Sequence, residues 1–358
     1  MAKINRPCQG KKGFALQFNW LFVLIGGAVI LGFFISLIVN GLAGEEGITA
    51  QKRTEEIDSV LKVSLAAGDT QKTLFFNQKI IFSCDEISEY FVEEAFKYSR
   101  YDYNALFSPS ELDGRELVIL TRVFEAPFRV MPLVYVTNKD IEYVFVGDSG
   151  LITQTYNLMP DNATTAAISP DILATYPDKN YDRTVFVLDV NDENSLARLH
   201  NFNRAKQDRI FAVVINASEG TVNNYGVLDF YRYEQEAFVL SKSAPFLTLD
   251  LALGGIISHD KTMYECNLRK VLQRLEMLGE LHMKRMLEIY YENSNDFCQV
   301  YYAGQPYSAQ EHFESIKQGA EKKELSLDNF RNIFSAINDL RTLNMINISA
   351  RTDCAPIY

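Results

Sequence analysis

The segment Gly147-Asp148-Ser149-Gly150 holds the residues best placed for covalent chemistry. It follows an apolar run, Tyr143–Gly147, that predicts a β-strand, and it precedes a predicted helix over 151–158. A serine at a strand end can act as a nucleophile when a histidine, oriented by an acid, takes its proton and donors receive the oxyanion. Asp148 and Ser149 are therefore candidate catalytic residues. We favour a simple turn, because these residue types are also common in turns.

The same block resembles the first block of GDS-type SGNH hydrolases, in which the serine is the nucleophile. The resemblance implies a base in a DxxH motif near the C-terminus, and Ser258-His259-Asp260 is not that motif. It also implies a Gly-x-Asn-Asp block, but Asn216 follows Val213-Val214-Ile215 and lacks these partners. An anchored serine hydrolase that uses Ser149 stays as an alternative function.

Acidic side chains gather where another predicted strand, 184–190, ends: Asp189, Asp192 and Glu193. Open α/β sheets place ligand and divalent-ion sites at the carboxyl ends of their strands, so these three are candidate metal ligands. Acids also suit the start of a helix, and we favour that interpretation. No Gly-x-Gly-x-x-Gly follows a strand and no Gly-x-x-x-x-Gly-Lys occurs, so the sequence predicts no cofactor.

The elements that position these residues point to an α/β fold. Residues 69–248 are predicted to form an α/β domain with a mixed or parallel sheet and flanking helices, since nearly continuous apolar strands alternate with helical stretches. Its predicted strands are Leu117–Phe124, Leu133–Thr137, Tyr143–Gly147, 184–190, 209–216 and an edge hairpin over 226–242. Upstream, 73–84 predicts a hairpin around Asn77-Gln78, and 86–99 predicts a helical or irregular segment.

Residues 249–358 are predicted to be a helical region that ends in a hairpin of two helices. One helix covers 261–292, where apolar residues recur with helical spacing. The other begins at Ser326, a helix cap, with Leu325 and Phe330 placed as a hydrophobic staple. Gly254-Gly255 predicts a turn between helical runs.

The uncharged run Trp20–Val39 is long enough to cross the hydrocarbon core of a bilayer. We predict a transmembrane helix over 17–43 and a stalk helix over 44–68. Basic residues precede the run and Glu45 and Glu46 follow it, so residues 1–16 are predicted to be cytoplasmic and the bulk of the chain outside the cell. Two alternatives remain: a cleaved secretory signal, and a type IV pilin-like signal cut after Gly13, where Phe18 stands at the usual glutamate position.

Four of the five cysteines, Cys84, Cys266, Cys298 and Cys354, fall on the predicted outer side. An even number there predicts two disulfides. A single helix over 266–293 would hold its ends about 40 Å apart, which disfavours a Cys266–Cys298 bond. An antiparallel pair of helices would bring Cys354 to Cys266. Cys84 would then pair with Cys298.

The part after residue 44 carries 31 basic and 46 acidic residues, a formal charge of 31 − 46 = −15. This acidity argues against nucleic acid as a partner. Apolar residues make up 47% of the chain, which is enough for a packed core. The predicted partners are the lipid bilayer, through residues 17–43, and other proteins at the cell surface.

The chain resembles uncharacterised single-pass membrane proteins of archaea in four features: QFNWLFVLIGGA, the segment from FSP to PLVYVT, a cysteine-bearing helix and the terminal CAPIY. The resemblance covers most of the chain and implies no activity. From the anchor, the acidic outer part and the incomplete catalytic set, we expect a non-enzymatic extracytoplasmic protein of binding or surface-assembly type. The alternatives are the anchored hydrolase and a pilin-like filament subunit.

Overall fold

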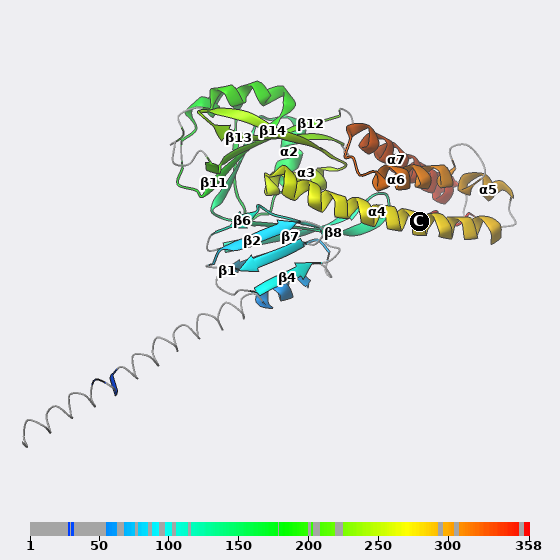
Figure 1. The fold of residues 1–358 in the computed structure, drawn as a ribbon. Coiled ribbons are helices and arrows are strands. Elements are labelled where there is room, and N and C mark those ends of the chain that lie inside the picture. The colour runs from blue at the N-terminus through cyan, green and yellow to red at the C-terminus, as the bar shows by residue number, and fades with distance from the viewer. Residues whose placement is uncertain are drawn as a thin grey trace, which may run out of the picture. The chain divides into compact units, whose positions relative to one another are not determined.

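The computed structural model describes residues 28, 30–31, 55–62, 68–75, 78–84, 88–92, 97–101, 105–113, 116–177, 179–199, 202, 208–218, 225–292, 296–303, 308–350 and 354–358. Residues Thr54–Tyr358 form one compact unit (Figure 1). The predicted segment 1–16, the pilin-type cut at Gly13 and nearly all of the predicted span 17–43 lie outside the described residues. Within the described part of the chain, every helix is too short or too polar to cross a membrane.

The largest sheet contains six strands in the order β10-β9-β11-β12-β13-β14. Its strands are β9 (Ile141–Val146), β10 (Thr164–Ile168), β11 (Arg183–Asp189), β12 (Ile210–Ala217), β13 (Gly226–Glu234) and β14 (Ala237–Phe246). The first four of this order pair in parallel, and β13 and β14 add an antiparallel edge. The predicted mixed sheet is confirmed. Strand β10 is absent from the prediction because its short, half-exposed sequence carries little apolar signal.

Both faces of this sheet are covered, which explains the continuous apolar runs in its central strands. In β9, Tyr143 and Phe145 join the core on the side of α3 (Leu249–Ser258). Val144 and Val146 join the core on the other side, under the 3-10 helices η1 (Pro170–Thr175) and η2 (Val190–Arg198). Helix α2 (Gly150–Leu158) contacts β9 and β11. The sheet is therefore the middle layer of a mixed α/β fold.

Two four-stranded sheets precede β9, with the orders β1-β7-β8-β5 and β4-β3-β2-β6. Their strands are β1 (Thr70–Phe75), β2 (Ile80–Cys84), β3 (Ser88–Val92), β4 (Lys97–Tyr101), β5 (Ala105–Phe107), β6 (Glu111–Leu112), β7 (Glu116–Glu125) and β8 (Arg129–Asn138). The predicted hairpin over 73–84 is wrong, because β1 pairs with β7 while β2 pairs with β3 and β6. The predicted helical or irregular segment 86–99 instead contributes β3 and most of β4. Partners distant in sequence override the local pattern here.

The helical residues 55–62, within the predicted stalk, pack against the folded unit. Ile57 and Leu61 are buried in its core. The hydroxyl of Tyr90 in β3 donates to Asp58 at 2.6 Å. This end of the predicted stalk is therefore joined to the β4-β3-β2-β6 sheet (Figure 1).

Five helices follow the six-stranded sheet: α3, α4 (Lys261–Glu292), α5 (Asp296–Tyr302), α6 (Ala309–Glu321) and α7 (Leu327–Ala350). The predicted helix over 261–292 is confirmed, and so is the cap, since the Asn329 amide donates to Ser326 Oγ at 3.4 Å. The predicted turn at Gly254-Gly255 is wrong, because both glycines lie inside α3, where the sheet approaches closely.

The predicted two-helix hairpin is also wrong, because α6 lies between α4 and α7. Helix α6 runs antiparallel to α4: Arg269 donates to the Lys323 carbonyl at 2.6 Å, while His282 stacks on Phe313. Helix α7 then reverses again: Lys322 donates to Asn329 at 2.8 Å beside the turn, and Asp339 farther along α7 lies 3.7 Å from His312 near the start of α6. As a result α7 runs parallel to α4. The buried face of α6 combines Phe313 and Ile316 with the small residues Ala309, Gly319 and Ala320.

The four predicted outer cysteines form two disulfides, but the predicted pairing is wrong. The bonds are Cys84–Cys266 and Cys298–Cys354, with Cα atoms 5.9 and 5.6 Å apart. The additional helix explains the difference. Because α7 runs parallel to α4, the chain after α7 reaches the far end of α4, near Cys298, while Cys266 in the first turns of α4 bonds Cys84 of β2.

Candidate functional site

A cleft of about 580 Å³ lies at the amino ends of the parallel strands. Its lining is mostly charged or polar and comes from β6, the six-stranded sheet and the turn after α3. We call it the amino-edge cleft; it is lined by Lys79, Ser110, Glu111, Asp113, Asp182, Arg183, Asp208, Arg209, Ile210, Phe211, Arg232, Tyr233, Glu234, Gln235, Ser258, His259 and Asp260. Its volume is typical of sites for small ligands.

Strand register places three arginines on one face of the sheet at this cleft. Thr184 of β11 lies opposite Ile210 of β12, so the preceding residues, Arg183 and Arg209, project to the same side. Arg232 of β13 lies opposite Phe211, which is two residues after Arg209 and therefore on that side too. The Phe211 ring packs on His259, 4.5 Å between centroids, so the shared side is the one that α3 covers.

Carboxylates surround these arginines. Asp182 Oδ1 accepts from Arg209 Nη1 at 2.8 Å, and Asp260 Oδ2 accepts from Arg232 Nη2 at 3.0 Å. Arg183 is held more loosely, with Nη2 3.4 Å from Glu111 and Nε 3.7 Å from Asp182. Its side chain is 12% exposed, whereas those of Arg209 and Arg232 are each 52% exposed. One nearly buried guanidinium, on β11, thus lies beside two accessible ones at β12 and β13.

Glu111 joins β6 to this arrangement. It accepts from Lys79 Nζ at 2.7 Å and faces Arg183 with its other oxygen. The hydrogen bond from Lys79, with the charges of Lys79, Arg183 and Arg209, holds the pKa of Glu111 below its ordinary value despite partial burial. Glu111 is therefore ionised at neutral pH and supplies negative charge to the arginines.

His259 is neutral in the folded protein. Its Nδ1 donates to the Ile257 carbonyl at 3.1 Å, because a carbonyl can only accept, and this leaves Nε2 to accept from Arg183 Nη1 at 3.4 Å. Burial, together with the charge of Arg183, lowers the pKa of His259 to about 3. Both ring nitrogens are engaged, so His259 positions Arg183 rather than carrying protons near neutral pH.

Ser258 and Asp260, the neighbours of His259 in the chain, line the same wall of the cleft. Ser258 is fully buried, and its Oγ has no hydrogen-bond partner among the described residues. Asp260 caps α4 by accepting from the Met263 amide at 3.0 Å while it also binds Arg232. A buried hydroxyl without a partner is a group that a ligand or water must satisfy.

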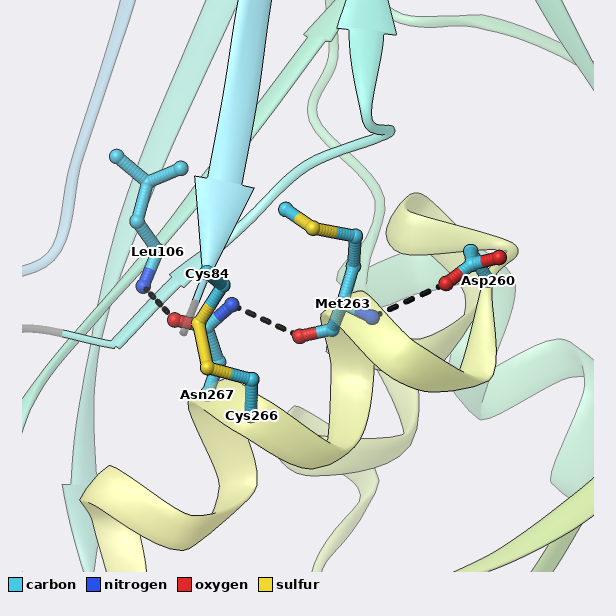
Figure 2. Close-up of a disulfide and its surroundings, with 6 residues drawn as sticks. All are labelled: Cys84, Leu106, Asp260, Met263, Cys266 and Asn267. Atoms are coloured by element: carbon cyan, nitrogen blue, oxygen red, sulfur yellow. Dashed lines mark hydrogen bonds between the residues drawn. A yellow bond between two sulfur atoms is a disulfide. The ribbon is translucent and has the colours of Figure 1, made fainter. Parts of the chain in front are cut away.

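The first turns of α4 are fixed to the N-terminal strands (Figure 2). Asn267 donates to the Met263 carbonyl at 2.9 Å and accepts from the Leu106 amide at 3.0 Å. The Cys84–Cys266 disulfide lies beside these bonds and joins α4 to β2. The wall of the cleft formed by His259 and Asp260 therefore rests on a cross-linked support.

Ser149 lies at the opposite edge of the sheet from the cleft. It caps α2, accepting from the Ile152 amide at 3.2 Å, and Asp148 beside it is exposed. The length of β11 puts about 20 Å between the two edges of the sheet. His259, the histidine of the cleft, is therefore too far from Ser149 to take its proton. The other described histidines, His282 and His312, lie in α4 and α6. Ser149 thus has a structural role as a helix cap.

The three acidic candidates each have a different local role. Asp189 caps η2, accepting from the Asn191 amide at 3.1 Å, and Glu193 accepts a hydrogen bond from the Tyr231 hydroxyl. Asp192 lies over Gly147, and its pKa is raised by burial and by the charges of Asp189 and Asp148. Among the described residues, no group of three or more histidine, cysteine or acidic side chains is arranged to hold a metal ion.

The arginines of the cleft are absent from the candidates named from the sequence, although the sequence carries a signal for two of them. The dipeptide Asp-Arg occurs at the start of both β11 and β12, as Asp182-Arg183 and Asp208-Arg209. Parallel strands bring their amino ends to one edge, so this repeat predicts neighbouring charges there. Arg232 and Glu111 carry no comparable signal, because antiparallel register and the β6 contact bring them in.

Comparison with protein-family models, with curated proteins and with solved structures found no match to this chain. The resemblance to archaeal membrane proteins therefore stays a prediction. The function is argued below from the geometry of the amino-edge cleft.

Proposed function

We propose that this chain is a non-enzymatic binding protein, anchored in the membrane by residues 17–43 with the bulk of the chain outside the cell, and that the amino-edge cleft holds its ligand. The observation that carries the proposal is the set of three arginines that three adjacent strands present to one cleft of about 580 Å³. A concave site with a few convergent polar groups is the usual form of a small-ligand site.

The disulfides support the outer location. Cys84–Cys266 and Cys298–Cys354 use all four cysteines of the predicted outer part. Disulfides persist in oxidising compartments and are rare in the cytosol. This agrees with the topology expected from the charges that flank the apolar N-terminal run.

The chemistry of the cleft favours binding over catalysis. An acid–base catalyst is most effective with a pKa near the working pH. His259 has a pKa of about 3, and both of its nitrogens are engaged. Arginine and lysine, by contrast, recognise acceptors through charge and donors that do not titrate near neutral pH.

Ligand screening with the full chain in detergent tests this proposal. Melting curves are recorded with small anionic, cationic and neutral compounds, because a ligand at about 100 times its Kd adds about 2.7 kcal/mol of stability. We expect at least one class to raise Tm, and Arg209→Gln to remove the rise.

The matched control is Arg198→Gln. Arg198 lies on η2, its side chain is 55% exposed, and it pairs with Asp171 away from the cleft. This variant should keep the full response. A screen in which no class raises Tm, or in which both variants lose the response equally, contradicts a ligand site at the cleft.

A further inference from the structure

The two exposed arginines of the cleft, Arg209 and Arg232, do not use all of their N–H donors in ion pairs. A guanidinium carries five N–H groups. Arg209 uses Nη1 on Asp182, and Arg232 uses Nη2 on Asp260. Their remaining donors have no acceptor among the described residues, and half of each side chain is exposed. An incoming acceptor can therefore bind without breaking either ion pair.

The inner carboxylates of the cleft, in contrast, are already shared. Asp182 faces both Arg183 and Arg209, and Glu111 faces both Lys79 and Arg183. Of the remaining acids of the lining, Asp260 is paired with Arg232, while Asp113, Asp208 and Glu234 are exposed at the rim, where water screens their charge. The groups inside the cleft that can still form hydrogen bonds are thus arginine N–H donors, which suit a negatively charged acceptor.

Glu111 marks where such an acceptor fits. Its Oε1 lies 3.4 Å from Arg183 Nη2, which is longer than the usual distance for a charge-assisted hydrogen bond. Arg183 has no tighter contact with a carboxylate, and the buried Ser258 hydroxyl nearby lacks a partner among the described residues. A carboxylate or phosphate of a ligand can satisfy groups that the protein satisfies poorly.

We infer that the amino-edge cleft binds a small organic anion, whose carboxylate or phosphate group lies against Arg183, Arg209 and Arg232, and that Glu111 competes with this anion for Arg183. The inference rests on the proposed ligand site and adds the chemical class of the ligand. It also assigns Glu111 a role as an internal competitor.

Calorimetric titration of the full chain in detergent tests the inference. The probes are succinate and citrate for carboxylates, glycerol phosphate and inorganic phosphate for phosphates, and choline and glucose as cationic and neutral comparisons. We expect one anion group to bind and its affinity to fall as salt is raised.

Two variants are expected to change the binding affinity in opposite directions. Arg232→Gln should weaken binding about tenfold or more, since a charge-assisted hydrogen bond is lost. Glu111→Gln should tighten binding about threefold or more, because the competing charge near Arg183 is removed. Asp171→Asn is the matched control: it removes an exposed acid of η1 that pairs with Arg198 outside the cleft, and the affinity should stay within about twofold.

The outcomes separate the inference from the proposed function. Binding by choline or glucose that Arg209→Gln abolishes leaves the cleft as a ligand site but overturns the anion. Anion binding that is insensitive to Arg232→Gln, or that Glu111→Gln weakens, also overturns the inference. Whether carboxylates or phosphates bind identifies the headgroup. Failure of every probe contradicts both proposals.

Discussion

Replacing Gly254 with alanine tests how tightly α3 packs on the sheets beneath the cleft. Helix propensity alone predicts a gain of about 1 kcal/mol in the free energy of unfolding, because alanine is the better helix former. However, a Cβ atom at residue 254 would lie 2.7 Å from two atoms of the Phe107 ring. Phe107 is fully buried, with Tyr135 and Tyr264 at ring-centroid distances of 5.8 and 5.9 Å. Its ring therefore cannot move away from the added Cβ atom.

The overlap should outweigh the propensity. Overpacking a dense core costs about 1–3 kcal/mol. Gly254→Ala should therefore change the free energy of unfolding by about 0 to −2 kcal/mol once the propensity gain is included. The matched control is Gly279→Ala in the interior of α4, where the new Cβ would lie 3.7 Å from Ile316, an ordinary contact. The control should gain about 1 kcal/mol.

Urea unfolding of the full chain measures both variants under one condition, with the m-value as a check on two-state behaviour. The expected difference between them is about 1–3 kcal/mol. Equal stability of the two variants would refute the reasoning, because it would mean that α3 does not press on Phe107. Since Ser258 and His259 end α3, Gly254→Ala should also alter ligand binding at the cleft.

Two further predictions concern the cross-link and the buried histidine. Replacing Cys298 and Cys354 with serine should cost about 4 kcal/mol in urea unfolding, because the bond closes a loop with a sequence separation of 56 residues; a loss below about 1 kcal/mol would contradict a bond that constrains the unfolded chain. His259 stays neutral in the folded protein down to a pKa of about 3, while the unfolded chain takes up a proton near pH 6.5. Stability should therefore fall as the pH drops from about 6.5 towards 3, by about 1.4 kcal/mol per pH unit relative to His259→Asn. Asparagine tolerates the left-handed backbone of residue 259, whose φ is 37°. Parallel stability curves for the two proteins would show that His259 titrates normally.

Much of the fold could be predicted from local patterns. The consecutive apolar residues of β9, β11 and β12 require cover on both faces, and this requirement alone predicts a parallel sheet between helical layers. The stripe of Leu268, Val271 and Leu275 predicts α4, and Ser326 predicts the start of α7. Each of these signals lies within one element, because the periodicity of burial is written along the chain itself.

The candidate site, in contrast to the fold, could not be predicted from local patterns. Asp148 and Ser149 form a plausible catalytic pair in sequence, yet they lie at one edge of the sheet, where Ser149 caps α2, while the cleft lies at the other edge. The cleft unites Glu111, Arg183 and Arg232 through strand register and a contact between separate sheets. No spacing in the sequence relates these residues, since the partners of a strand are chosen by surfaces distant along the chain.

By itself, the sequence determined the class of fold, the helix boundaries marked by caps and the presence of two cystines. Only the tertiary structure decided which cysteines bond, which strands share a sheet, and where charged groups converge. The helix α6 illustrates the reason. Although neither Cys266 nor Cys354 lies in α6, its presence reverses the direction of α7 and moves Cys354 from one end of α4 to the other. The spacing of apolar residues shows which face of each segment is buried. Which strands and which cysteines pair depends instead on the number and direction of all the segments between them.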